Sequence, residues 1–144
     1  MKHFNLLQTY LSNLAVLNVK LHNIHWNVAS EQFMQVHTFT EGLYDKLFED
    51  FDSVAELLKM KGEYPLSTMA EYLEHTTVQE VKAKDFTTKE SLEITKAELE
   101  AMRKLATEIR NTADGEGDFE TVAVFEDYVA NYSKQIWFLS AMLK

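Results

Sequence analysis

The chain of 144 residues contains no cysteine, a single proline and only four glycines. Without cysteine it has neither disulfides nor thiolate metal sites, and we expect a cytoplasmic location. So little proline and glycine leaves few turns, which favours a small number of long helices over many short strands. We find no apolar run of about eighteen residues and no signal-like segment at the start, so we expect neither a membrane span nor secretion.

Positive charge is also scarce. The chain has 14 lysines and arginines against 23 aspartates and glutamates, a net charge of −9. Such a surface repels nucleic acid and anionic lipid unless basic residues are segregated, and here they are scattered, with no lysine-rich tail. The hydrophobic content of 46% is enough for a real core, because a chain of this length buries about two thirds of its unfolded surface. We expect one domain over residues 1–144.

Apolar residues at spacings of three and four predict four long helices. Two span about residues 5–28 and 33–60, and the apolar stripes of the others run over 92–113 and 122–143. A capping box at Thr87–Glu90 opens the third, and Asp118 is the expected N-cap of the fourth. Between the second and third, Thr68 opens a short helix through Leu73. The pattern predicts an all-α, ferritin-like four-helix bundle with a short helix in its long crossover.

Two histidines and two carboxylates form the candidate metal site, a donor set that iron, manganese and zinc accept. His25 and His37 each lie six residues from the turn at Glu31, so antiparallel helices bring them to the same height. Asp52 and Glu56 share one helix face, one turn apart. His37 and Asp52 are fifteen positions apart (52 − 37), or roughly 22 Å along one helix. The four residues are therefore either unrelated or joined at one metal through a second copy of the chain.

For the second copy to supply its carboxylates, the two second helices must cross antiparallel about a two-fold axis near residue 45. Gly42 lies close to that point and would let the helices approach. The axis then generates two equivalent sites, each with two imidazoles from one chain and two carboxylates from the other. In this interpretation the chemistry belongs to an oligomer interface.

Several segments resemble one known family. Leu21-His22-Asn23-Ile24-His25-Trp26, the later His37 and the Asp52-x-x-x-Glu56 spacing resemble the Dps-like miniferritins, the dodecameric branch of the ferritin superfamily. The segments GEYPLSTMAEYLEH and Ile136-Trp137-Phe138 extend the likeness over essentially the whole chain. The resemblance implies that one subunit supplies His25 and His37 as iron ligands and its two-fold mate supplies Asp52 and Glu56. Glu41 falls where many members have an aspartate, and is a candidate further ligand.

The same resemblance implies a function. A hollow dodecamer of this family binds Fe(II), oxidises it, preferably with hydrogen peroxide but also with dioxygen, and stores the ferric product as a mineral core, which protects against oxidative stress. The alternative is the nucleoid DNA binding of other members, but their basic terminal extension is absent here, so DNA binding is not expected. A carboxylate-bridged di-iron oxygenase is rejected, because the four helices lack its Glu-x-x-His motifs.

Trp26 and His22, both close to His25 in the sequence, each admit two roles. Trp26 either intercepts radicals beside the metal or packs a subunit interface, where tryptophan is common. His22, one turn before His25, either joins a second metal position or is structural. His3 and His75 are expected at the surface.

Acidic residues gather in two places. Four precede or open the last helix, where they form either an ordinary acidic turn or an acidic pore at a three-fold axis: Asp114, Glu116, Asp118 and Glu120. Glu41, Asp45 and Glu49 follow one another at a spacing of four and could face a cavity as mineral-nucleating carboxylates. Asp50, next to Glu49, is expected to be solvated or to face the cavity as well.

Overall fold

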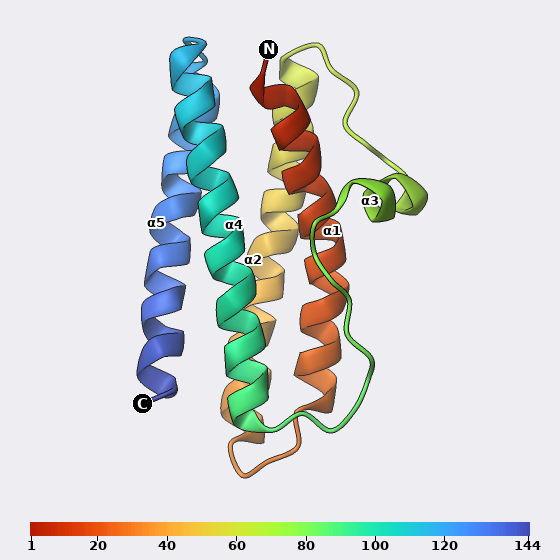
Figure 1. Cartoon of the computed structure of the whole chain (residues 1–144), viewed down its shortest axis with the longest axis vertical. Coiled ribbons are helices and arrows are strands. Elements are labelled where there is room, and N and C mark those ends of the chain that lie inside the picture. The colour runs from red at the N-terminus through yellow and green to blue at the C-terminus, as the bar shows by residue number, and fades with distance from the viewer.

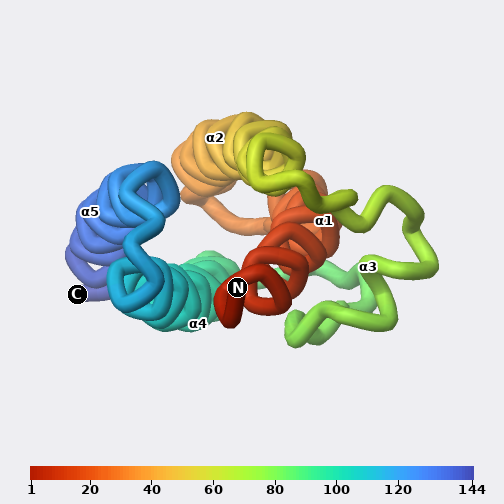
Figure 2. Tube along the Cα trace, turned by 90° about the horizontal axis from the view of Figure 1, so that it is seen from above, coloured from red at the N-terminus to blue at the C-terminus, as the bar shows by residue number.

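The computed structural model describes residues 1–144 as five helices without a sheet. They are α1 (His3–Asn27), α2 (Phe33–Met60), α3 (Met69–His75), α4 (Thr88–Gly115) and α5 (Phe119–Met142). The four long helices lie side by side, and the short α3 lies outside α1 (Figures 1 and 2). The predicted all-α bundle is confirmed, with helix bounds close to those expected from the sequence.

The order of the helices follows the predicted crossover plan. The short turn after α1 returns the chain antiparallel as α2, and α4 and α5 form a second antiparallel pair (Figure 1). Residues 61–87 then run from the end of α2 along the outside of α1 to the start of α4, at the opposite end of the bundle. Consequently α2 and α4 point the same way, as in ferritin-like bundles with one long connection.

Local side-chain chemistry sets the helix ends. Thr87 accepts a hydrogen bond from the Glu90 backbone N–H, and the Glu90 side chain accepts one from the Thr87 N–H, which completes the predicted capping box. Asp118 caps α5 by accepting from the Thr121 N–H. Thr68 caps α3 in the same way, although α3 continues to His75 rather than ending at Leu73.

Side chains of α1 hold the crossover along its length. The Asn13 amide donates to the Thr77 hydroxyl (3.0 Å) and accepts from the Thr77 backbone N–H (2.9 Å). Further along α1, the Asn23 amide donates to the Val81 carbonyl at 2.9 Å. At the far end the Phe86 N–H donates to the Asn27 carbonyl at 3.0 Å. The long connection is therefore fixed onto the bundle by hydrogen bonds that a polar face of α1 provides.

The predicted apolar stripes of the four long helices form one core. Its largest fully buried members include Leu7, Tyr10, Leu14, Phe125 and Tyr132. Tyr10 and Tyr132 meet hydroxyl to hydroxyl inside it, so neither leaves a polar atom without a partner.

Two polar residues expected at the surface are buried, which corrects the sequence analysis. His3 is 0% exposed because α1 begins at that residue and places it on the same stripe as Leu7. Its Nε2 lies 2.8 Å from an Asp118 carboxylate oxygen. Asp50 is also buried, and Lys46, one turn earlier on α2, reaches it with Nζ at 2.5 Å from Oδ1. A buried carboxylate is tolerated only with such a partner.

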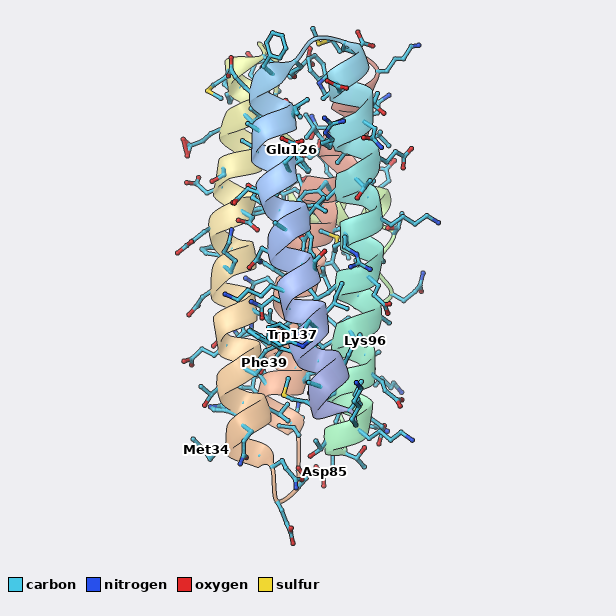
Figure 3. The ribbon with its side chains drawn as sticks, turned by 90° about the vertical axis from the view of Figure 1, so that its left-hand side faces the viewer. Met34, Phe39, Asp85, Lys96, Glu126 and Trp137 are labelled. Carbon is cyan, nitrogen blue, oxygen red and sulfur yellow. The ribbon has the colours of Figure 1, made fainter.

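Several large apolar side chains remain on the outside of the chain. On the α1–α2–α3 side, Val19, Phe48 and Met69 are each more than half exposed. On the α2–α5 side, Figure 3 shows Trp137 of α5 in the lower half of the bundle, and this side chain is 65% exposed. None of the five helices has the length and hydrophobicity that a membrane span requires.

Candidate metal centre

His25 and His37 meet face to face, as their equal distances from the turn predict. Their ring centroids are 3.6 Å apart and the ring planes differ by 13°. His25 is buried at the end of α1 and His37 is half-buried on the first turns of α2. Phe33, one turn before His37, stacks on the other side of its ring at 4.9 Å. The two imidazoles are therefore held as a rigid stack at the α1–α2 end of the bundle.

The hydrogen bonds of this pair are reciprocal. The His25 Nδ1 lies 2.6 Å from the His37 carbonyl oxygen, and the His37 Nδ1 lies 2.8 Å from the His25 carbonyl oxygen. A carbonyl only accepts, so each Nδ1 carries the hydrogen and each Nε2 keeps a free lone pair. Metal-binding histidines are oriented in this way by a bond from their second nitrogen. The pair thus presents two Nε2 atoms that can bind a metal ion.

Burial also favours the metal-binding form of His25. Removal from water lowers the pKa of His25, and the neighbouring His37 lowers it further, although the bond to the His37 carbonyl and the Glu41 carboxylate act in the opposite direction. A neutral imidazole is the form that binds a metal, because protonation would occupy Nε2.

The carboxylate pair is also formed within the chain. Asp52 and Glu56 lie one turn apart on the exposed face of α2. The pKa of Glu56 is raised, chiefly because its side chain shares a hydrogen bond with Asp52 and because the two negative charges repel. A cation placed between the two would relieve this repulsion. Within one chain, no three histidine, aspartate or glutamate side chains come close enough to hold a metal ion together.

Tyr44 is a residue of this region that the sequence analysis did not identify as part of the site. Its hydroxyl lies 3.5 Å from the His25 Nε2, and its ring contacts His25 edge-on at 5.1 Å. Burial raises the pKa of Tyr44, and the Glu41 and Asp45 carboxylates raise it further. Glu41 thus lies near both His25 and Tyr44. Only the spacing from His37 to Tyr44, two helical turns, could have signalled this position in the sequence.

Trp26 contacts His22 rather than the stacked pair. The Trp26 and His22 rings are 5.3 Å apart, and Trp26 is 65% exposed. His22 in turn stacks on Tyr44 at 3.7 Å. His22 also lies edge-on to His25, with ring centroids 6.3 Å apart, so Trp26 approaches the stacked pair through His22. His75 is exposed on α3, as expected.

The acidic turn before α5 divides into two parts. Asp118 is only 5% exposed, and its two carboxylate oxygens contact His3, Lys61 and Thr121. Although burial alone would raise the pKa of Asp118, these hydrogen bonds and the Lys61 charge hold it well below its usual value. Asp118 is thus a structural residue in the chain, whereas three carboxylates remain nearer the surface: Asp114, Glu116 and Glu120.

Comparison with known proteins identifies the family of this chain. The ferritin-like domain family matches residues 4–144. The chain is 36% identical to the DNA protection during starvation protein of Helicobacter pylori over 143 residues, 99% of each chain. It is 34% identical to the protein of the same name from Listeria innocua, over 92% of this chain and 86% of that one.

Solved structures show the same fold. The CAIP protein of Helicobacter cinaedi superposes with a TM-score of 0.94 at 34% identity, covering 96% of this chain and 97% of that chain. The Dps protein of Vibrio cholerae O1, described as a member of a broad superfamily of ferritin-like diiron-carboxylate proteins, gives 0.92 at 25% identity, with 97% and 87% covered. With the family match, the relatives and the crossover bundle in agreement, the chain belongs to the Dps-like miniferritins of the ferritin-like family.

Proposed function

We propose that this protein binds Fe(II) at a site shared between two chains, oxidises it and stores the ferric product inside a hollow dodecamer, which limits oxidative damage. One chain would supply His25 and His37, and its two-fold partner would supply Asp52 and Glu56. The observation that carries the proposal is the reciprocal histidine pair, in which both Nδ1 atoms are bonded to carbonyls and both Nε2 atoms carry no hydrogen, so that each can bind a metal. The carboxylate pair of Asp52 and Glu56, whose charges repel, lies on the same helix as His37 but does not reach the histidine pair within one chain.

The donor chemistry suits iron oxidation. Neutral imidazoles hold the ferrous ion, and the harder carboxylate oxygens favour Fe(III), which makes loss of the electron easier. Two carboxylates neutralise the two charges of Fe(II) but leave one charge of Fe(III) unbalanced. The ferric ion is therefore held less tightly and can move to a cavity. Hydrogen peroxide is the proposed oxidant, with dioxygen as the slower alternative.

An exposed apolar face supports the proposal that a second chain packs against the first. The groove between α1, α2 and α3 is lined almost entirely by apolar side chains, including Val19, Phe48 and Met69. Phe48 is 60% exposed and lies on α2 between Tyr44 and Asp52. Apolar patches of this kind usually mark contact surfaces. A copy of the chain packed here would cover the patch and bring its own α2 alongside.

The names of the relatives support a protective role for this chain, whereas its charge argues against DNA binding. Several are called DNA protection during starvation protein. The net charge of −9 of this chain repels the negatively charged phosphate backbone of DNA. We infer that protection here acts through removal of Fe(II) and peroxide.

The test replaces the carboxylates without changing their shape. Asp52→Asn with Glu56→Gln should abolish most peroxide-driven oxidation of Fe(II), because both charges facing the metal are lost, while helical content and particle mass stay unchanged. His25→Ala and His37→Ala should each do the same by removing one nitrogen ligand. His75→Ala is the matched control, since this exposed histidine belongs to neither pair. Oxidation by the Asn/Gln double variant at the unchanged rate would refute the proposed site.

A further inference from the structure

A pocket that the proposed iron site does not use lies where α1, α4 and the crossover meet. Its volume is about 200 Å³, which is room for roughly six or seven water-sized groups. Val78 and Met102 are the buried apolar part of its lining, and Leu105 is half-buried beside them. A small hollow with an apolar lining and a few polar groups is the usual form of a small-molecule site.

A buried lysine fixes one wall of this pocket. Lys20 of α1 is 7% exposed, and its Nζ lies 2.6 Å from the Gln79 carbonyl oxygen and 2.7 Å from Glu98 Oε1. The Glu98 side chain is thereby held on the pocket wall at 17% exposure. The chain offers no hydrogen-bond donor to its other oxygen, Oε2, although a carboxylate oxygen has room for about two. The pocket therefore contains a preformed, half-used acceptor.

The crossover wall is fixed as firmly. Asn13 of α1 is 3% exposed, and its amide bonds Thr77 twice, donating to Oγ1 at 3.0 Å and accepting from the backbone N–H at 2.9 Å. The Thr77 hydroxyl, which lines the pocket, accepts in this arrangement and has no acceptor for its own hydrogen. Neither wall must rearrange to admit a ligand, so little order has to be imposed on binding.

The charges of the lining favour a cationic ligand. Glu108 and Lys104 are exposed members of the lining, and neither forms an ion pair within the chain. Glu98 and Glu108 are ten positions apart (108 − 98) on α4, or roughly 15 Å along the helix. Leu105 lies between these two carboxylates on the same side of α4. The lining thus offers a carboxylate, then an apolar surface, then a second carboxylate.

We propose that this pocket binds a small molecule that carries a primary ammonium group on a short apolar chain. The ammonium group donates to Glu98 Oε2, and the apolar chain covers Met102 and Leu105. A charged hydrogen bond of this kind is strong when the carboxylate is partly shielded from water. Binding needs one chain and no iron, so it is independent of the proposed iron site.

Two kinds of molecule share this chemistry. One is a linear aliphatic diamine, whose second ammonium group would approach Glu108. The other is a free amino acid with an apolar side chain, whose carboxylate would meet Lys104. Lys104→Met distinguishes them, because it should tighten binding of a diamine by removing a like charge and weaken binding of an amino acid by removing its partner.

The experiment titrates the assembled, metal-free protein with cadaverine, a linear diamine, and separately with leucine, and measures binding by calorimetry. Binding of at least one of the two is expected, and it should slow amide hydrogen exchange in residues 76–79 of the crossover. Glu98→Gln removes the charge that the ammonium group meets, and Ala101→Leu fills the pocket from α4. Each should weaken binding by more than about ten-fold, since a charged hydrogen bond or the apolar space is lost.

Two controls are matched to these changes. Glu100→Gln removes the same charge from an exposed position of α4 that does not line the pocket. Ala123→Leu adds the same side chain at an exposed alanine of α5. Neither should change the affinity. Asp52→Asn with Glu56→Gln should also leave it unchanged, so a failure of the iron site would not be mistaken for a failure of this one.

Three results would overturn the proposal: no binding of either ligand by the wild type, binding that survives Ala101→Leu unchanged, or equal losses in Glu98→Gln and Glu100→Gln. The Glu98 variant leaves the buried Lys20 without its charged partner, which destabilises a fold. The Ala101 variant leaves that ion pair intact and keeps the test valid if the Glu98 variant does not fold.

Discussion

Mixing two inactive variants tests whether two chains share the iron site. One variant carries His37→Ala, and the other carries Asp52→Asn with Glu56→Gln. Each parent assembly lacks a ligand at every site. In a mixed two-fold dimer, one site receives both histidines from the second variant and both carboxylates from the first, so it is complete. The other site retains only His25, because all the other ligands at that interface have been replaced.

The expected activity follows from the symmetry. A two-fold interface carries two equivalent sites, and random pairing of equal amounts makes about half of the dimers mixed, so about a quarter of all sites should be complete. The proteins would be mixed after reversible dissociation or expressed together, and peroxide-driven oxidation of Fe(II) would be followed by absorbance. The assemblies of each parent alone, treated identically, give the baseline.

Co-assembled particles that stay as inactive as their parents would refute the shared site. Exchange of chains must be shown independently, for example by mass spectrometry of particles in which one variant is isotopically labelled. Activity well above a quarter would also count against the model, because it would mean that one chain can complete a site without its partner.

Four further predictions concern Asp118, the subunit interface and DNA. Asp118→Asn should lower the free energy of unfolding by about 3 kcal/mol, since it leaves the buried His3 and Lys61 without their charged partner; chemical denaturation measures it, with Asp114→Asn as control. The pKa of Asp118 is depressed, so its contribution should be complete above about pH 4 and be lost as the pH falls below that; stability of the Asn variant that follows the wild-type acid profile would contradict this. Gly42→Phe should prevent dimer formation and Fe(II) oxidation together while the helices persist, and a proven monomer with full oxidation would exclude an interface site. At neutral pH and physiological salt the particle should not retard plasmid DNA in a gel, and salt-sensitive retardation would reveal a basic surface created by assembly.

The sequence predicted the bundle well because each part of the pattern has a local cause. Apolar spacing defines the buried stripe of each long helix, and the Thr87–Glu90 and Asp118 caps fix two helix starts through side chains a few residues away. The meeting of His25 and His37 was also predictable, since a short turn forces two helices to run antiparallel. These features depend on residues that are close in the sequence, so the sequence of one chain is enough to predict them.

What the sequence did not predict depends on contacts between distant segments. His3 is buried because Asp118, 115 positions later, meets it at the end of the bundle, where Lys61, the residue after α2, binds the same carboxylate. No residue near His3 in the sequence indicates those partners. The spacing of four between His3 and Leu7, however, already placed His3 on the buried stripe of α1. Asp50 is a similar case, since its neighbours include Tyr10 of α1 and Asp127 and Tyr128 of α5.

The exchange of hydrogen bonds between His25 and His37 explains why an unusual local arrangement is useful. Both carbonyls accept from imidazoles across the α1–α2 contact, and the His25 carbonyl lies in the last turn of α1, where carbonyls lack a partner within the helix. The result fixes both tautomers before any metal arrives, so that neither ring must turn or lose a proton from Nε2 to bind. Replacing either histidine removes a ligand of the same ion and also the ring on which the other imidazole is stacked, although the backbone carbonyl that accepts from the other Nδ1–H remains. We accordingly expect His25→Ala and His37→Ala to be non-additive, the double variant being scarcely less active than either single one, whereas independent ligands would give losses that multiply.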